Sequence, residues 1–314
     1  MKKLEAFMKR KDIEISAKRY GIDALGAMAQ GLFCSLLIGT IINTLGTQLN
    51  IPYFNTVGGY ATAMSGPAMA VAIGYALHCP PLVLFSLIAV GNAANGLGGA
   101  GGPLAVLIIA IIAAEFGKAV SKETKIDILV TPLVTIFVGV SLSALWAPAI
   151  GQAASAVGQI IMWATEQQPF IMGVLVSVIV GIALTLPISS AAICAALSLT
   201  GLAGGAAVAG CCAQMIGFAV QALRAKNNIG KSISVGIGTS MLYWPNIIKK
   251  PAIWLPTILT SAILGPIGVC LLNTTSTSSG AGMGSCGIVG QLSALETMGY
   301  NNPNTYISIF VIQF

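Results

Sequence analysis

The residues best suited to binding a polar solute lie in a glycine-rich stretch between two long apolar runs, GNAANGLGGAGGP at 91–103. A glycine costs a helix interior roughly 1 kcal/mol relative to alanine, so we expect the helix to break here. The backbone groups freed around Gly98 and Gly99, with the amides of Asn92 and Asn95, would then line a water-filled cavity. A second interpretation is close helix packing through small residues.

A second glycine cluster, GLAGGAA at 201–207, follows Thr200, and we expect a matching break there. Farther along the same apolar run lies Gln214. An amide inside an apolar helix either hydrogen-bonds to a neighbouring helix or lines the solute path, and the sequence leaves both open.

A third polar stretch, NTTSTSSGAGMGSCG at 273–287, is too polar for a spanning helix. We expect a re-entrant segment in which Asn273, Ser276 and Ser278 face a cavity. A mobile outer loop is the alternative.

His78 is the only histidine of the chain and precedes Cys79-Pro80-Pro81. Imidazole changes charge near neutral pH, so His78 is a candidate for proton transfer or for contact with a phosphoryl donor. A polar helix end is the simpler interpretation. Glu115 lies three residues before Lys118; it either forms a surface i,i+3 ion pair or takes part in proton coupling.

Motifs of catalysis are missing from the sequence. There is no G-x-x-x-x-G-K-[ST] stretch and no nucleophile–base set. The seven cysteines form no C-x-x-C pair, and one histidine cannot complete a familiar zinc site. We therefore predict no catalytic residue, no metal site and no cofactor, which makes an enzyme the less favoured class.

The composition is that of a polytopic membrane protein. Of 314 residues, 56% are hydrophobic and only 8% are charged, whereas a soluble domain carries about 25% charged residues. The net charge of +6 comes from basic groups between the apolar runs, as expected for cytoplasmic loops, and no nucleic-acid partner is predicted. These groups lie at 2–19, 118–125, 224–231 and 249–250.

The apolar runs predict about ten transmembrane helices, since about 20 residues cross the bilayer core. A last run, 304–314, would be only about 16 Å long as a helix, which predicts that the chain ends inside one. The expected spans are 24–45, 57–78, 81–95, 103–120, 129–150, 169–187, 188–200, 204–223 and 251–272.

An N-terminus in the cytoplasm places all fifteen Lys and Arg residues inside, provided that 151–166 lies at the interface without crossing. If 151–166 crosses, the second half of the chain is inverted.

An internal duplication is indicated by GYALHCP at 74–80 and GIALTLP at 181–187. Each is followed by an apolar segment, a glycine cluster, an apolar helix ending in charge and a Pro-led span. Repeated halves with broken helices are typical of secondary transporters, whose solute site lies near the midplane.

These features together resemble the IIC-type membrane proteins of the bacterial phosphotransferase system, in particular the PfoR-like branch. The resemblance rests on the basic start, GYALHCPP, GNAANGLGGAGGP, the repeat and the 273–287 stretch. It implies a bacterial inner-membrane permease, usually a homodimer, that binds a sugar or sugar-like solute. It also implies separate cytoplasmic IIA and IIB partners.

We therefore expect an all-α, polytopic inner-membrane helical bundle with two internal repeats and broken or re-entrant helices. A cytoplasmic amphipathic arm, 1–23, would precede one transmembrane domain, 24–314, with halves 57–150 and 169–272 and a re-entrant segment at 273–292. The function expected is a permease for a small, neutral polar solute. The alternative is a membrane sensor or regulator that binds a solute or a partner without transport.

Overall fold

The computed structural model describes residues 2–225 and 228–314, and the regular elements in these ranges are helices. The one β-type pairing recorded for them is an isolated bridge between Gly201 and Ser276. The all-α prediction is confirmed. Lys226, which belongs to the third basic group, lies outside the described residues.

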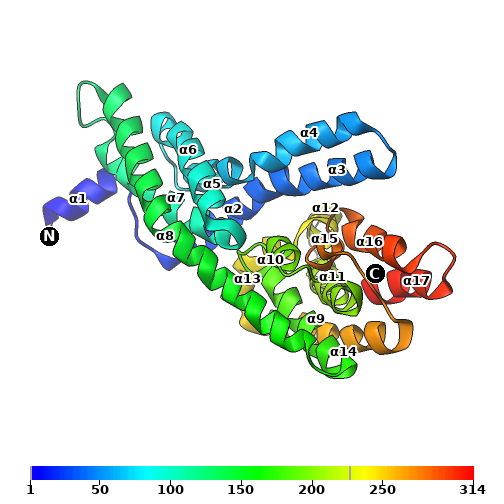
Figure 1. The fold of residues 1–314 in the computed structure, drawn as a ribbon. Coiled ribbons are helices and arrows are strands. Elements are labelled where there is room, and N and C mark those ends of the chain that lie inside the picture. Colours follow the sequence, from blue (N-terminus) through cyan, green and yellow to red (C-terminus); the bar gives the residue numbers. More distant parts are fainter. Residues whose placement is uncertain (1, 226–227) are drawn as a thin grey trace. The chain divides into compact units, whose positions relative to one another are not determined.

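The chain forms two compact units, which we describe separately (Figure 1). Unit 1 comprises residues up to Gly39 and Gly59–Gln152, and unit 2 comprises Thr40–Gly58 and Ala153–Phe314. The helices α3, α4 and α8 each contribute residues to both units.

The elements from the N-terminus to α8 are α1 (Lys2–Arg10), η1 (Arg19–Ala24), α2 (Leu25–Leu32), η2 (Phe33–Leu37), α3 (Ile38–Gln48), α4 (Pro52–Ala63), α5 (Ser65–Ala76), α6 (Pro81–Gly98), η3 (Gly99–Gly101), α7 (Gly102–Val120) and α8 (Asp127–Thr165). The remaining elements are α9 (Pro169–Thr185), α10 (Ser190–Ala196), α11 (Gly201–Arg224), α12 (Ile229–Ile233), η4 (Ser234–Gly238), η5 (Ser240–Tyr243), α13 (Trp244–Lys249), η6 (Pro251–Trp254), α14 (Leu255–Leu272), α15 (Ser278–Ala281), η7 (Cys286–Ile288), α16 (Val289–Met298), α17 (Pro303–Ile307) and η8 (Ser308–Gln313).

Five helical stretches of the described chain are long and apolar enough to cross a membrane, and one of them includes both arms of the α6–α7 pair with the turn between them. The apolar helix α9, with 17 residues, is shorter. The figure of about ten spans, the repeats and the re-entrant geometry stay predictions. The five segments are Arg19–Gln48, Pro81–Val120, Asp127–Thr165, Gly201–Arg224 and Pro251–Leu272.

Three of the expected spans have different boundaries in the structure. The helix expected at 57–78 is interrupted at Met64, which separates α4 from α5. The span expected at 188–200 is wrong, because α10 has seven residues and is about 10 Å long. Ser189 caps its start and Ser198, in the left-handed conformation, follows its end. The span expected at 129–150 is longer in the structure, because α8 runs unbroken for 39 residues through Pro148 and includes most of 151–166.

In unit 1, α6 and α7 form an antiparallel hairpin. A Cβ atom on Gly98 would lie 3.1 Å from Ala105 Cβ, and one on Gly117 would lie 2.8 Å from Val83 Cγ1, so the helices touch at both ends. Gly99 has φ +50°, a conformation that L side chains rarely adopt, and ends α6. Pro103 lies in the first turn of α7, where its missing N–H is no loss.

In unit 2, α9, α11 and α14 pack through small residues. A Cβ on Gly181 would lie 2.8 Å from Gly210 O, and one on Gly173 would lie 2.7 Å from Pro266 Cα. The Ser177 hydroxyl donates to Ser261 O at 2.8 Å. Close backbone approach of this kind gives apolar helices in a membrane the van der Waals contact that holds them together.

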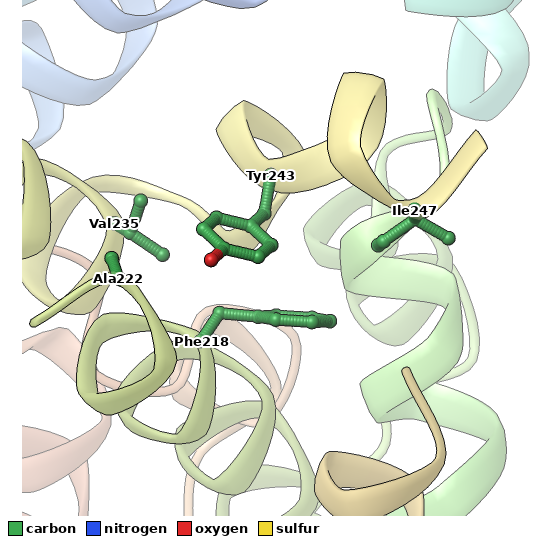
Figure 2. Packing of buried hydrophobic residues seen from close by; sticks show 5 residues of the cluster. All are labelled: Phe218, Ala222, Val235, Tyr243 and Ile247. Carbon is green, nitrogen blue, oxygen red and sulfur yellow. The ribbon is translucent and has the colours of Figure 1, made fainter. Parts of the chain in front are cut away.

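The segment after α11 is held to it by an aromatic cluster (Figure 2). The Phe218 and Tyr243 rings are stacked with centroids 4.9 Å apart, and Ala222, Val235 and Ile247 are buried around them. Trp244 and Trp254 meet edge to face at 5.6 Å. These contacts hold the short helices between α11 and α14 against the end of α11.

Candidate functional site

The last turns of α6 and the turn that follows them contain four of the predicted solute-binding residues. Asn92 is exposed on α6 and, with Phe85 and Ile136, lines a groove of about 420 Å³. Asn95 is half-buried, and its Nδ2 donates to Ser65 Oγ at 3.4 Å. Gly98 is buried in the hairpin contact, and Gly99 is the exposed left-handed residue of the turn. The predicted helix break is confirmed.

In unit 2 the structure brings two of the predicted stretches together. Gly201 N donates to Ser276 O at 3.1 Å, and Ser276 N donates to Gly201 O at 3.3 Å. Thr200 is the exposed residue before α11, and a Cβ on Gly204 would lie 2.9 Å from Ser276 O. The glycine cluster of α11 therefore gives the 273–287 segment room to lie against the helix.

The polar segment after α14 is well ordered by its own hydroxyl groups. Asn273 ends α14 in the left-handed conformation and is exposed, whereas Ser276 is buried. Ser278 is half-buried and begins α15. The hydroxyl of Thr277 lies 3.0 Å from Ser293 Oγ, which joins the segment to α16. This bonding is that of a packed structure rather than of a loose loop.

Two buried amides in this region were not singled out from the sequence. Gln291 on α16 and Gln313 in η8 are 2% and 1% exposed, and their Oε1 atoms have no hydrogen-bond partner within the described part of the chain. The Nε2 atom of Gln291 lies 3.6 Å from Cys212 Sγ, and that of Gln313 lies 3.4 Å from Ser308 Oγ. An unpaired carbonyl oxygen in a buried site accepts a hydrogen bond from any donor that enters. The signal in the sequence was the same as for Gln214, an amide between apolar residues.

Gln214 itself is completely buried, and both ends of its amide are engaged. Its Oε1 accepts from Trp254 Nε1 at 2.9 Å and from Thr257 Oγ1 at 2.8 Å. Its Nε2 lies 3.4 Å from Ser261 Oγ. These contacts connect α11 with α14 and favour the interpretation that Gln214 bonds neighbouring helices.

His78 and Glu115 belong to a charged network in unit 1 that attaches the N-terminal arm. His78 Nδ1 lies 3.2 Å from Asp12 Oδ2, and the His78 side chain is 76% exposed. Arg19 donates to both carboxylate oxygens of Asp12 and to Leu77 O, the last at 2.9 Å. The Arg19 guanidinium holds the pKa of Asp12 at about 2, with a smaller contribution from His78, so the carboxylate stays charged at neutral pH.

Glu115 and Lys118 form the expected ion pair, with Oε2 and Nζ 3.0 Å apart. The expected surface location is wrong, because the Lys118 side chain is 1% exposed. Its ammonium also donates to Asp12 O at 2.6 Å and to Leu77 O at 3.1 Å, and Tyr20 OH donates to Glu115 Oε1 at 3.1 Å. Asp12, Arg19 and Tyr20 could not be assigned to this network from their spacing, because contacts across 58 to 106 residues depend on the fold.

One family model covers nearly the whole chain, including the polar segments and the closely packed helices described above. Residues 22–314 match the family described as "Phosphotransferase system, EIIC". The chain belongs to the phosphotransferase-system EIIC family. Proteins of this family are membrane components of sugar transport, so the chain is an integral membrane transport subunit and not a catalytic domain. The EIIC family also implies a sugar substrate and association with the cytoplasmic components of the system.

No curated protein and no solved structure matches this EIIC chain. The match over residues 22–314 confirms the expected family, and the PfoR-like branch remains a prediction.

Proposed function

We propose that the chain is a permease of a bacterial inner membrane that binds a neutral, hydroxyl-rich solute, a sugar or a sugar-like molecule, near the midplane of the bilayer. It would act as a homodimer with its N-terminus in the cytoplasm, together with separate IIA and IIB proteins. The observation that carries the solute class is the set of buried polar groups along α11, α15 and α16 of unit 2, which are hydroxyls and amides.

The charges of the described residues support a neutral solute. The buried polar residues of α11, α15 and α16 are Gln214, Gln291 and Ser293, none of which carries a charge. Two buried carbonyl oxygens, on Gln291 and Gln313, lack donors. A sugar hydroxyl supplies such a donor, whereas a phosphate or a carboxylate brings further acceptors.

Two regions are candidates for the binding contacts. The first is the α6–α7 turn with Asn92, Asn95, Gly98 and Gly99. The second, favoured by the unpaired amides, lies along α11 and the segment after α14. Its candidate residues are Thr200, Gln214, Asn273, Ser276, Ser278, Gln291 and Gln313.

Solute binding tests the proposal and distinguishes the two regions. We expect neutral hexoses or polyols to raise the melting temperature of the purified protein, and sugar phosphates or dicarboxylates to have no such effect. Gln291→Ala should weaken binding by about 5- to 30-fold, because one hydrogen bond of about 1–2 kcal/mol is lost. Asn95→Ala should do so only if the α6–α7 turn contributes.

Gln167→Ala is the matched control, since Gln167 lies between α8 and α9 and its Nε2 donates to Trp163 O. Normal binding by both Gln291→Ala and Asn95→Ala would contradict the proposed contacts. Preferential binding of dicarboxylates would contradict the neutral solute.

The proposed orientation has its own test in cysteine labelling from outside the cell, in a cysteine-free background. We expect cysteines at Asn50 and Ser279 to react and cysteines at Lys122 and Asn228 to be protected, because the basic groups lie inside. All four positions are exposed in the structure, so protection would reflect the membrane. Reaction at position 228 would instead support inverted halves.

A further inference from the structure

A cleft with a volume of about 350 Å³ lies where the C-terminal ends of α1, α5 and α7 meet in unit 1. Each of these ends is followed by a residue in the left-handed conformation: Asp12 at φ +51°, His78 at φ +56° and Lys122 at φ +60°. All three residues line the cleft, together with Arg10 and Glu123 among others.

Three basic side chains at or beside this cleft, Lys11, Lys118 and Arg19, bind backbone carbonyl oxygens at the helix ends. Helix C-termini present unpaired carbonyl oxygens and a partial negative charge, which a cation can satisfy. Lys11 donates to Ser121 O, and Lys118 and Arg19 both donate to Leu77 O. Arg19 also neutralises Asp12.

The donors that bind no helix-end carbonyl and could contact a ligand in the cleft are Arg10, Lys122 and the Nε2 atom of His78. The Arg10 side chain is 61% exposed, and Lys122 is exposed and makes no ion pair with the described residues. His78 Nδ1 faces Asp12, so that Nε2 is left for another partner. The three groups come from three different segments: the end of α1, the α5–α6 turn and the α7–α8 loop.

Glu123 shows that an anion is held at this place. Its Oε1 lies 2.7 Å from Arg10 and 2.5 Å from Lys11, although the Glu123 side chain is 38% exposed. It belongs to the exposed loop between α7 and α8, and its carboxylate sits at the cations without filling the cleft.

We propose that this cleft binds the phosphate group of a phosphate monoester. When no phosphate is bound, the Glu123 carboxylate pairs with Arg10 and Lys11. Arginine and lysine are the usual phosphate ligands, and Arg10 presents the planar fork that binds two phosphate oxygens at once. Donors converging from three segments suit a tetrahedral oxyanion better than a planar carboxylate. The site is separate from the solute contacts proposed above, and it does not depend on which solute is transported.

The single histidine makes the site directly observable. In protein labelled with ¹⁵N-histidine, the imidazole signals belong to His78 alone. We expect inorganic phosphate, added to the full chain in detergent at constant ionic strength, to shift the Nε2 signal saturably. Potassium chloride at the same ionic strength should leave that signal in place.

Variants of the lining residues should change the phosphate affinity in opposite directions. Glu123→Gln removes the competing carboxylate and should tighten phosphate binding about two- to fivefold, the range of an exposed ion pair. Lys122→Gln should weaken binding about two- to fivefold for the same reason, and the Arg10→Gln/Lys122→Gln double variant should abolish saturation. Lys125→Gln is the matched control in the same loop, because Lys125 does not line the cleft.

The phosphate has two sources of the same chemistry, a soluble monoester and the headgroup of an anionic lipid. Glucose 6-phosphate in lipid-free detergent represents the first, and nanodiscs with phosphatidic acid in place of phosphatidylcholine represent the second. A Glu123-dependent shift of the His78 signal in either arm supports the site and names its ligand. No saturable shift in either arm, for both wild type and Glu123→Gln, would overturn the proposal. An equal response of the Lys125→Gln and double variants would overturn it as well.

Discussion

Lys118→Met is expected to be among the most destabilising single substitutions in this protein. The Lys118 ammonium is buried and contacts Asp12 O, Leu77 O and Glu115 Oε2. Methionine keeps the apolar stem but leaves the Glu115 carboxylate without its counter-ion. Removing one partner of a buried ion pair typically costs about 3–5 kcal/mol. A fall in the melting temperature of the detergent-solubilised protein measures this loss.

The Glu115→Gln/Lys118→Met double variant separates the charge effect from the loss of packing. Because it removes both charges, it should recover part of the stability that Lys118→Met loses. The exposed Lys125→Met, in the following loop, is the control and should melt like the wild type. If Lys118→Met also melted like the wild type, the buried position of Lys118 would be refuted.

Gly210→Ala should produce the second large effect, because it separates two packed helices. A Cβ on Gly210 would lie 2.5 Å from Ser177 C and 2.7 Å from Ser177 Cα, both backbone atoms of α9. Backbone atoms cannot rotate away as a side chain does, so α9 and α11 must move apart. Overpacking of this kind typically costs about 1–3 kcal/mol, and the melting temperature should fall accordingly.

Gly96→Ala is the matched control for the same chemical change. Gly96 lies in α6, is exposed, and a Cβ there would meet no atom within 4 Å. Since alanine favours a helix over glycine by roughly 1 kcal/mol, this variant should melt at or above the wild-type temperature. Were Gly210→Ala to melt as high as Gly96→Ala, the contact between α9 and α11 would be disproved.

The helix boundaries marked by glycine and proline were predictable from the sequence. The expected break near Gly99 is present, and the runs expected at 103–120 and 204–223 differ from α7 and α11 by at most three residues at either end. Glycine and proline act through the backbone of their own residue, so their effect is local.

Boundaries that depend on weaker signals were not predictable. The polar residues after Pro148 lower the hydropathy of α8 without disfavouring a helix, and the helix continues to Thr165. Conversely, the apolar run at 188–200 has the composition of a span but forms only the short α10. Hydropathy reports whether a segment suits a membrane, but it does not report where hydrogen bonding ends a helix.

Some residues of the candidate sites could also be predicted from the sequence, whereas their partners could not. Asn95, Ser276 and His78 could be named because polar residues are conspicuous in an apolar chain. The partners that give them a role, such as Ser65, Gly201 and Asp12, are up to 75 residues away in the sequence. Gln291 was missed for a similar reason, since only the fold shows that its carbonyl oxygen is buried without a donor.

The α6–α7 hairpin also has a consequence for how the protein is made. Each arm, with 18 or 19 residues, is about 27–29 Å long, so each is slightly shorter than the bilayer core of about 30 Å. As α6 leaves the ribosome, the amides of Asn92 and Asn95 oppose its entry into lipid alone, whereas α7 is more apolar and contacts α6 at both ends. We therefore expect the two helices to enter the membrane as a pair, with the more apolar α7 favouring the insertion of α6 and the tight turn at Gly99 keeping them side by side.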